Sequence, residues 1–164
     1  MMAITPRVGI SKTGNKAEDL FRTFTSSQKP TEAVLGDAVK NGIYAEVKKV
    51  SGDTLNQVRA VKYITLVAYD ADRDDWYVVP ACDVVALIAV KERGQHTENP
   101  FESATLSLRH LGPYKVSSSD LSTAWAAAVQ KSDGKTLLKQ KMKEVLQECK
   151  NLSAAHKKAV RALV

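Results

Sequence analysis

The sequence predicts a single α+β domain in which a mixed β-sheet is flanked by helices. At 164 residues the chain is long enough to bury a real core but short enough to form one domain. Its composition, 44% hydrophobic and 26% charged, is that of a folded domain rather than a disordered chain. Helical periodicity comes first, strand-like segments follow, and helical periodicity returns at the end. This order, without any internal repeat, excludes a solenoid or a helical bundle.

The first helix is expected at about 16–25. Asn15 or Thr13 can cap its start. The apolar residues with the i, i+3, i+4, i+7 spacing of a helix face are Ala17, Leu20, Phe21 and Phe24. Residues 1–13 are expected to form a loose arm, and a polar loop should follow the helix at 26–31.

A β-hairpin is predicted at Asn41-Gly42. Both central residues of a type I′ turn need a positive φ, and Asn-Gly is the dipeptide that favours it most. A two-residue loop at this point predicts strands near 33–40 and 43–50. The hairpin is the segment around which a functional site can be built.

In this hairpin register, Asp37 lies opposite Glu46 with the Cβ atoms about 5 Å apart. Because side chains alternate along a strand, Lys48 shares the face of Glu46. Like charges in opposite positions destabilise a sheet by up to about 1 kcal/mol, and a divalent cation bound by oxygen ligands would offset this cost. The alternative is a solvent-exposed hairpin whose acids and lysines only serve solubility, with Lys48 paired to Glu46.

The middle of the chain alternates short apolar and polar segments. We expect a short helix at 54–62, with Gln57 on it, and then a strand at 63–69 that is apolar enough to be buried on both faces. The acidic segment 70–75 lacks an EF-hand pattern and is predicted to be an exposed turn. A further strand at 76–81 should end near its proline.

The next apolar segment, 82–90, fits a helix or a strand, and a short helix followed by a strand is the favoured interpretation. A polar loop is expected at 91–100. The spacing within 101–111 is helix-like, but 104–108 can equally form a strand.

Helices are predicted at 120–130 and 136–152, with a last one ending at Leu163. We therefore divide the chain into an α/β core at 1–116 and a helical basic extension at 117–164, which packs on the core or extends from it.

The positive charge is concentrated at the C-terminus. Residues 131–164 contain nine Lys or Arg and three acids, which accounts for the whole formal net charge of +6. A basic segment on a neutral body indicates a polyanion as partner, nucleic acid before membrane. The alternative is a solvated helical face without a partner.

Cysteine usage and hydropathy exclude several classes. Cys82 and Cys149 lie far apart without a CxxC or Cys/His cluster, so zinc binding is not expected and both are interpreted as free thiols in a reducing compartment. No apolar segment approaches the ~20 residues of a membrane span, and the first residues lack a signal-peptide pattern. The expected location is the cytoplasm.

The order of the polar residues resembles that of the PD-(D/E)XK nuclease superfamily, the restriction-endonuclease-like fold that includes Holliday-junction resolvases. A glutamate on an early helix precedes an aspartate on one strand, a Glu-x-Lys motif on the next strand and a glutamine after it. These residues are Glu18, Asp37, Glu46, Lys48 and Gln57. The resemblance covers about 16–81, and Gly36 stands where many members have proline before the aspartate.

The resemblance implies a DNA endonuclease that depends on Mg²⁺ or Mn²⁺, acts on double-stranded or branched DNA and forms a homodimer. Asp37 and Glu46 would bind the metal ion, while Lys48 would orient the attacking water or neutralise the phosphate. Glu18 would add an outer contact, and Gln57 would position the water or a phosphate. Alternatively, Glu18 is a helix-surface acid and Gln57 a solvent-exposed amide.

Further DNA contacts are assigned to His96, in the polar loop, and to the basic C-terminal residues. The latter are Lys139, Lys141, Lys143, Lys150, Lys157, Lys158 and Arg161. Two other functions remain open: a nucleic-acid-binding protein of the same fold without cleavage, and a structural protein whose basic tail binds an acidic partner.

Overall fold

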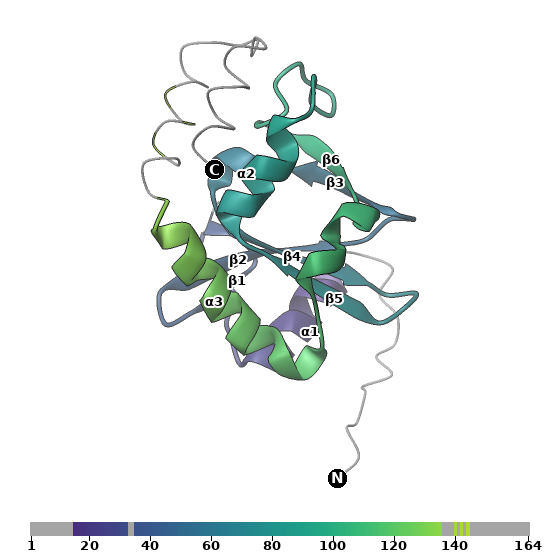
Figure 1. The fold of residues 1–164 in the computed structure, drawn as a ribbon. Coiled ribbons are helices and arrows are strands. Elements are labelled where there is room, and N and C mark those ends of the chain that lie inside the picture. The colour runs from purple at the N-terminus through teal and green to yellow at the C-terminus, as the bar shows by residue number, and fades with distance from the viewer. Residues whose placement is uncertain (1–14, 33–34, 136–139, 141, 143, 145–164) are drawn as a thin grey trace.

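The computed structural model describes residues 15–32, 35–135, 140, 142 and 144 (Figure 1). The helices are α1 (Asn15–Thr25), α2 (Ala81–Ala89) and α3 (Leu121–Asp133). The strands are β1 (Ala38–Lys40), β2 (Ile43–Lys49), β3 (Thr54–Val58), β4 (Thr65–Asp70), β5 (Asp75–Val79), β6 (Ala104–Ser107) and β7 (Lys115–Val116). Short 3₁₀ helices occupy Ala60–Lys62, Leu108–Tyr114 and Ser118–Asp120.

The central sheet is mixed, as predicted. Its strand order is β1-β2-β4-β5-β7, in which β2 and β4 are parallel and the other neighbours are antiparallel. A separate antiparallel pair joins β3 to β6. Figure 1 shows α2 and the β3–β6 pair on one side of the central sheet and α1 with α3 on the other. The predicted α+β class, with helices flanking a mixed sheet, is confirmed.

Each face of the sheet carries its own hydrophobic core. On one face, Phe21 of α1 and Trp125 of α3 pack together with ring centroids 5.2 Å apart, over Val47 and Val67 of the sheet. The other face buries residues of α2 and of the β3–β6 pair, including Leu55, Val85, Ile88 and Leu106. Strands β2 and β4 lie between these two cores, and Glu46 and Lys48 of β2 stay half-buried while Ala45 and Val47 between and beside them are buried.

The hairpin prediction is confirmed in its turn and register. Asn41 and Gly42 have φ of 50° and 78°, and Lys40 pairs with Ile43 across the two-residue loop. The strands are shorter than predicted on the first side, where β1 begins at Ala38. Positive φ at both turn positions is the geometry that Asn-Gly favours, so local turn chemistry sets the register of the whole hairpin.

The predicted helix at 54–62 is wrong: this segment forms β3 and then a 3₁₀ helix. Leu55 and Val58 are both buried, with a register shift of the β3–β6 ladder between them. Gln57 has a φ of 52° inside this irregularity. A bulge separates two inward-facing residues by three positions, which imitates the i, i+3 spacing of a helix.

Other predictions on the central segments are mostly confirmed. Strand β4 is buried along nearly its whole length, and β5 ends directly before Pro80, which is the N-cap of α2. The strand expected after a short helix within 82–90 is absent, because α2 spans Ala81–Ala89 and is buried on several sides. Within 101–111 the strand interpretation holds for Ala104–Ser107.

The end of the chain is described only in part. Helix α3 matches the prediction for 120–130. The predicted helix at 136–152 and the one ending at Leu163 lie outside the described residues, apart from 140, 142 and 144. Met142 is buried against the α2 side of the sheet. Within the described part of the chain, no helix is long and apolar enough to cross a membrane.

Candidate active site

Asp37 is held against β2 by the main chain on both sides of it. Its N–H donates to the Ala45 carbonyl at 2.8 Å, and its Oδ2 accepts a hydrogen bond of 2.8 Å from the Val47 N–H. Gly36 makes this approach possible: its φ is +102°, and a Cβ there would lie 2.7 Å from the Ala45 carbonyl oxygen. Arg22 of α1 donates to the Asp37 carbonyl oxygen at 2.6 Å. The carboxylate is therefore oriented before any ligand binds.

Helix α1 brings Glu18 to Asp37. Burial, then the negative charge of Asp37 and a hydrogen bond between the two carboxyl groups, raise the pKa of Glu18 from 4.5 to about 6. Burial also raises the pKa of Asp37, and the charge of Glu46 adds to this, against the hydrogen bond from the Val47 N–H. Asp37 thus has an acidic neighbour on each side, Glu18 and Glu46, whose charges oppose its own.

Lys48 lies among these acids. Burial lowers the pKa of its ammonium group, while the charges of Glu46 and Asp37 oppose this. The positive charges of Lys62 and Arg59 lower it further. Asp37, Glu46 and Lys48 therefore act on one another through their charges, although Asp37 lies just before β1 and outside the paired register.

Two hollows meet at Lys48. A solvent-open groove of about 460 Å³ is lined by Glu18, Lys48 and Asn56, together with Val47, Lys49, Val50 and Ser51. A smaller hollow of about 20 Å³ lies among Glu46, Lys48, Val58, Arg59, Lys62, Ile64, Leu66 and Val84. The groove is where a chain-like substrate can reach Lys48. A further cavity of about 490 Å³ lies at the other ends of β2 and β4, where Ile43, Tyr44 and Thr65 line it.

Sequence reasoning missed three residues of this site: Asn56, Arg59 and Lys62. Asn56 and Arg59 are exposed. Lys62 forms an ion pair with Glu46, with 3.2 Å between Nζ and Oε2. Asn56 could have been found from its place next to Gln57. Once residues 54–58 are assigned to a strand, Asn56 takes the position at the groove that was predicted for Gln57. No sequence signal links Lys62 to Glu46.

Gln57 does not line either hollow at Lys48. It is exposed on β3, and its N–H donates to Gln95 Oε1 at 2.6 Å, so its predicted placement on a helix beside the site is wrong. His96 is exposed in the loop 91–100 with a φ of 60° and lines neither hollow. The basic residues assigned to DNA lie outside the described residues; they are Lys139, Lys141, Lys143, Lys150, Lys157, Lys158 and Arg161.

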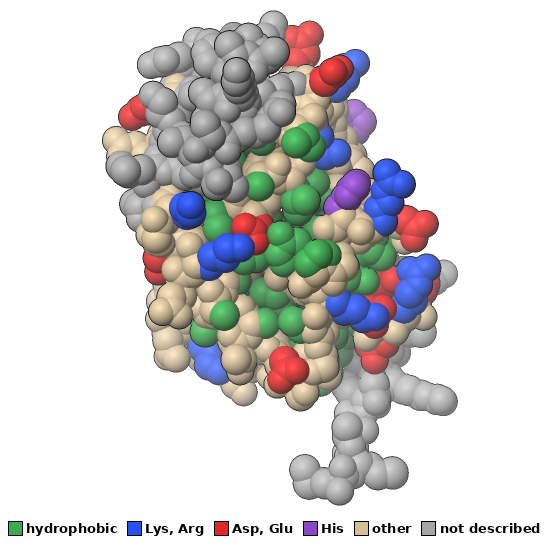
Figure 2. Space-filling model, viewed as in Figure 1, with side chains coloured by type: hydrophobic (Ala, Val, Ile, Leu, Met, Phe, Trp, Pro, Cys, Tyr) green, Lys and Arg blue, Asp and Glu red, His purple; other side chains and the backbone are tan. Residues whose placement is uncertain are grey.

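One face of the described surface has a mixed charge. On the face in Figure 2, the basic and acidic side chains of the described residues are interspersed, and hydrophobic side chains lie between them. This face offers isolated cations rather than a continuous basic track for a phosphate backbone.

The carboxylates fit a Mg²⁺ site of low protein-ligand number. Among the described residues, no three His, Cys, Asp or Glu are grouped so as to hold a metal ion. Asp37 accepts the Val47 N–H through Oδ2, and Glu46 Oε2 faces the Lys62 ammonium. Mg²⁺ is commonly bound by one or two carboxylates with water and substrate phosphate. The residues suit that arrangement and not an all-protein cage.

Comparisons with protein-family models, with curated proteins and with solved structures found no match.

Proposed function

We propose that this protein is a Mg²⁺-dependent DNA endonuclease of the restriction-endonuclease-like fold, with Asp37, Glu46 and Lys48 as its catalytic centre. The observation that carries the proposal is the position of Lys48: it lines both the open groove beside Glu18 and the small hollow beside Glu46. Burial lowers the pKa of its amine, and the charges of Glu46 and Asp37 oppose this. A pairing of Lys48 with Glu46 for solubility alone would not need a second acid oriented by a main-chain hydrogen bond.

Hydrolysis of a phosphodiester needs a nucleophilic water, charge stabilisation on the phosphate and a proton for the leaving oxygen. A bound Mg²⁺, held by Asp37 and Glu46, would supply Lewis acidity and a water of lowered pKa. The Lys48 ammonium would donate a hydrogen bond to the attacking water or to a nonbridging phosphate oxygen. Glu18, whose pKa of about 6 lets it change protonation state near neutral pH, would hold or accept a proton beside Asp37.

The proposal includes a homodimer. One chain carries one such centre, so cleavage of both strands at one position would need two chains. Light scattering on the purified protein, compared with the ratio of nicked to linear plasmid, tests this part separately.

Relaxation of supercoiled plasmid tests the catalytic claim. The variants are Glu46→Gln and Lys48→Met, which keep side-chain size and remove the charge. The matched control is Lys115→Met, which breaks the 3.1 Å ion pair of Lys115 with Asp75 at the β5–β7 edge. We expect Mg²⁺-dependent nicking by the wild type and the control only. Equal nicking by all four proteins would end the proposal, because the activity would then arise elsewhere.

A second candidate is a nucleic-acid-binding protein of this fold without cleavage. It is favoured by the ion pair between Lys62 and Glu46, which places a cation at the carboxylate without a metal ion. This candidate predicts DNA binding that weakens steeply with salt and no cutting at any Mg²⁺ or Mn²⁺ concentration.

A further inference from the structure

Lys62 is held in place by its backbone. It is the last residue of the 3₁₀ helix Ala60–Lys62, and its N–H donates to the Arg59 carbonyl at 3.1 Å. The Val61 N–H donates to the Phe101 carbonyl at 3.1 Å, which joins this turn to the segment before β6. Tyr63 ends the turn with a left-handed φ of 51°. The turn is therefore fixed from both sides, and the Lys62 side chain leaves it at a set position.

The Lys62 ammonium contacts Glu46 rather than solvent alone. The distance from Nζ to Glu46 Oε2 is 3.2 Å, and the two side chains are only 24% and 22% exposed. The positive charge of Lys62 also lowers the pKa of Asp37 and of Lys48. Lys62 thus acts on each of the residues to which the proposed function assigns catalysis.

We propose that Lys62 is a resident counter-ion of Glu46: it holds this carboxylate in place without metal, and it has to leave Glu46 before that carboxylate can bind a divalent cation. This inference rests on the proposed function for the identity of the metal site. The ammonium and a divalent cation would repel each other across this carboxylate, which disfavours the binding of both to Glu46. Lys62 is a positioning residue in this account.

The inference is tested by measuring Mn²⁺ binding in the absence of substrate. Calorimetry, or the electron spin resonance signal of the free ion, gives the affinity. Lys62→Met removes the charge at nearly constant length, and Lys62→Arg retains it. We expect Lys62→Met to bind Mn²⁺ about tenfold more tightly than the wild type, which corresponds to about 1.4 kcal/mol. Lys62→Arg and the control Lys115→Met should bind Mn²⁺ as the wild type does.

Thermal unfolding gives a readout that needs neither substrate nor activity. In EDTA, Lys62→Met should melt below the wild type, because Glu46 and Asp37 lose their counter-ion. Saturating Mn²⁺ should raise the melting temperature of Lys62→Met by more than that of the wild type. A variant that melts as the wild type does in EDTA would contradict the counter-ion role.

The outcomes separate this inference from the proposed function. Equal or weaker Mn²⁺ binding by Lys62→Met, with binding by the wild type, overturns the inference and leaves the nuclease proposal standing. Binding by Lys62→Met alone supports the inference and removes the metal-dependent activity proposed for the wild type. An absence of Mn²⁺ binding by every variant overturns both.

Discussion

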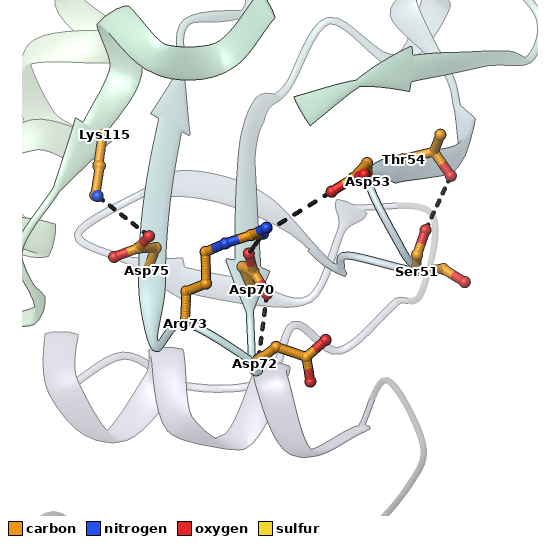
Figure 3. Close-up of polar contacts among 8 residues, drawn as sticks. All are labelled: Ser51, Asp53, Thr54, Asp70, Asp72, Arg73, Asp75 and Lys115. Atoms are coloured by element: carbon orange, nitrogen blue, oxygen red, sulfur yellow. Dashed lines mark hydrogen bonds and ion pairs between the residues drawn. The ribbon is translucent and has the colours of Figure 1, made fainter. Parts of the chain in front are cut away.

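The central sheet carries two acidic clusters, which differ in what lies opposite each carboxylate. In the turn between β4 and β5, Asp70 and Asp75 each face a cationic donor (Figure 3). The buried Asp70 accepts from Arg73 Nη1 at 2.7 Å and from the Asp72 N–H at 3.1 Å. Asp75 forms an ion pair with Lys115 at 3.1 Å. These acids stabilise a tight turn.

The cluster at the hairpin is built differently. Glu18 hydrogen-bonds to Asp37, another acid, and Asp37 in turn is affected by the charge of Glu46. Lys62 forms an ion pair with Glu46, while Arg22 and Lys48 act on Glu18 and Asp37 through their charge. Acids that are paired with donors contribute stability, whereas acids that face one another reduce it and gain from binding a cation. The contrast predicts that substitutions in the hairpin cluster change metal-dependent cleavage, whereas substitutions in the β4–β5 turn change the free energy of unfolding.

The largest expected effect separates the clusters by activity. Glu46→Gln should lower the rate of DNA cleavage at least about 100-fold, because one ligand and one transition-state charge contact are lost. Asp75→Asn, in the other cluster, should cleave at the wild-type rate. Single-turnover cleavage of a labelled duplex with Mg²⁺ measures both. Similar losses in the two variants would contradict the contrast.

Gly36→Ala should disturb only the hairpin cluster. A Cβ at this position meets the Ala45 carbonyl oxygen at 2.7 Å, and alanine disfavours a φ of +102°. We expect a loss of about 2 kcal/mol or more in the free energy of unfolding. Because Asp37 follows directly, cleavage by the folded fraction should fall as well. Urea denaturation measures the stability. An unchanged midpoint would contradict the prediction, because it would mean that the backbone of β2 shifts to make room for the Cβ without a loss of free energy.

Asp70→Asn should lower the stability of the fold and leave the rate of cleavage unchanged. The Asp70 side chain is 3% exposed and accepts two hydrogen bonds as an anion, so its neutralisation should cost about 2 kcal/mol. Cleavage per folded molecule should stay at the wild-type level, because this turn lines neither hollow at Lys48. Urea denaturation and active-site titration together check this. A loss of activity without a loss of stability would refute the structural role.

The smallest expected effect is a pH dependence of stability in EDTA. The pKa of Glu18 is about 6 in the folded protein against an ordinary 4.5, so its ionisation opposes folding as pH rises through this interval. Glu18→Gln removes that cost. Since solvent screens this partly exposed group, we expect a gain of about 1 kcal/mol well above pH 6.

Thermal unfolding over a pH series checks the sign. The gain from Glu18→Gln should disappear below pH 4.5, where the wild-type carboxyl is protonated in both the folded and unfolded states. A variant that is less stable than the wild type at high pH would contradict the repulsion between Glu18 and Asp37.

Local chemistry explains why part of the site could be predicted. Asn41-Gly42 specifies a two-residue turn, the turn sets the register, and strand alternation then places Lys48 beside Glu46. The buried strand β4 follows from its apolar residues alone.

The remaining features depend on contacts distant in the sequence. Lys62 reaches Glu46 only because the turn after β3 docks against the main chain of Phe101. The bulge at Gln57 gave β3 the periodicity of a helix, and α2 is so fully buried that its pattern resembles a strand. The spacing of apolar residues indicates which residues are buried. In a short segment it does not distinguish a helix from a strand.

The most direct test of the central claim is the position of Mn²⁺ in crystals soaked with this ion, located by its anomalous scattering. The account predicts a peak about 2.1 Å from a carboxylate oxygen of Asp37 and from one of Glu46, with the Lys62 ammonium moved away from Glu46. A peak at the Asp70–Asp75 turn with none between Asp37 and Glu46 would contradict it.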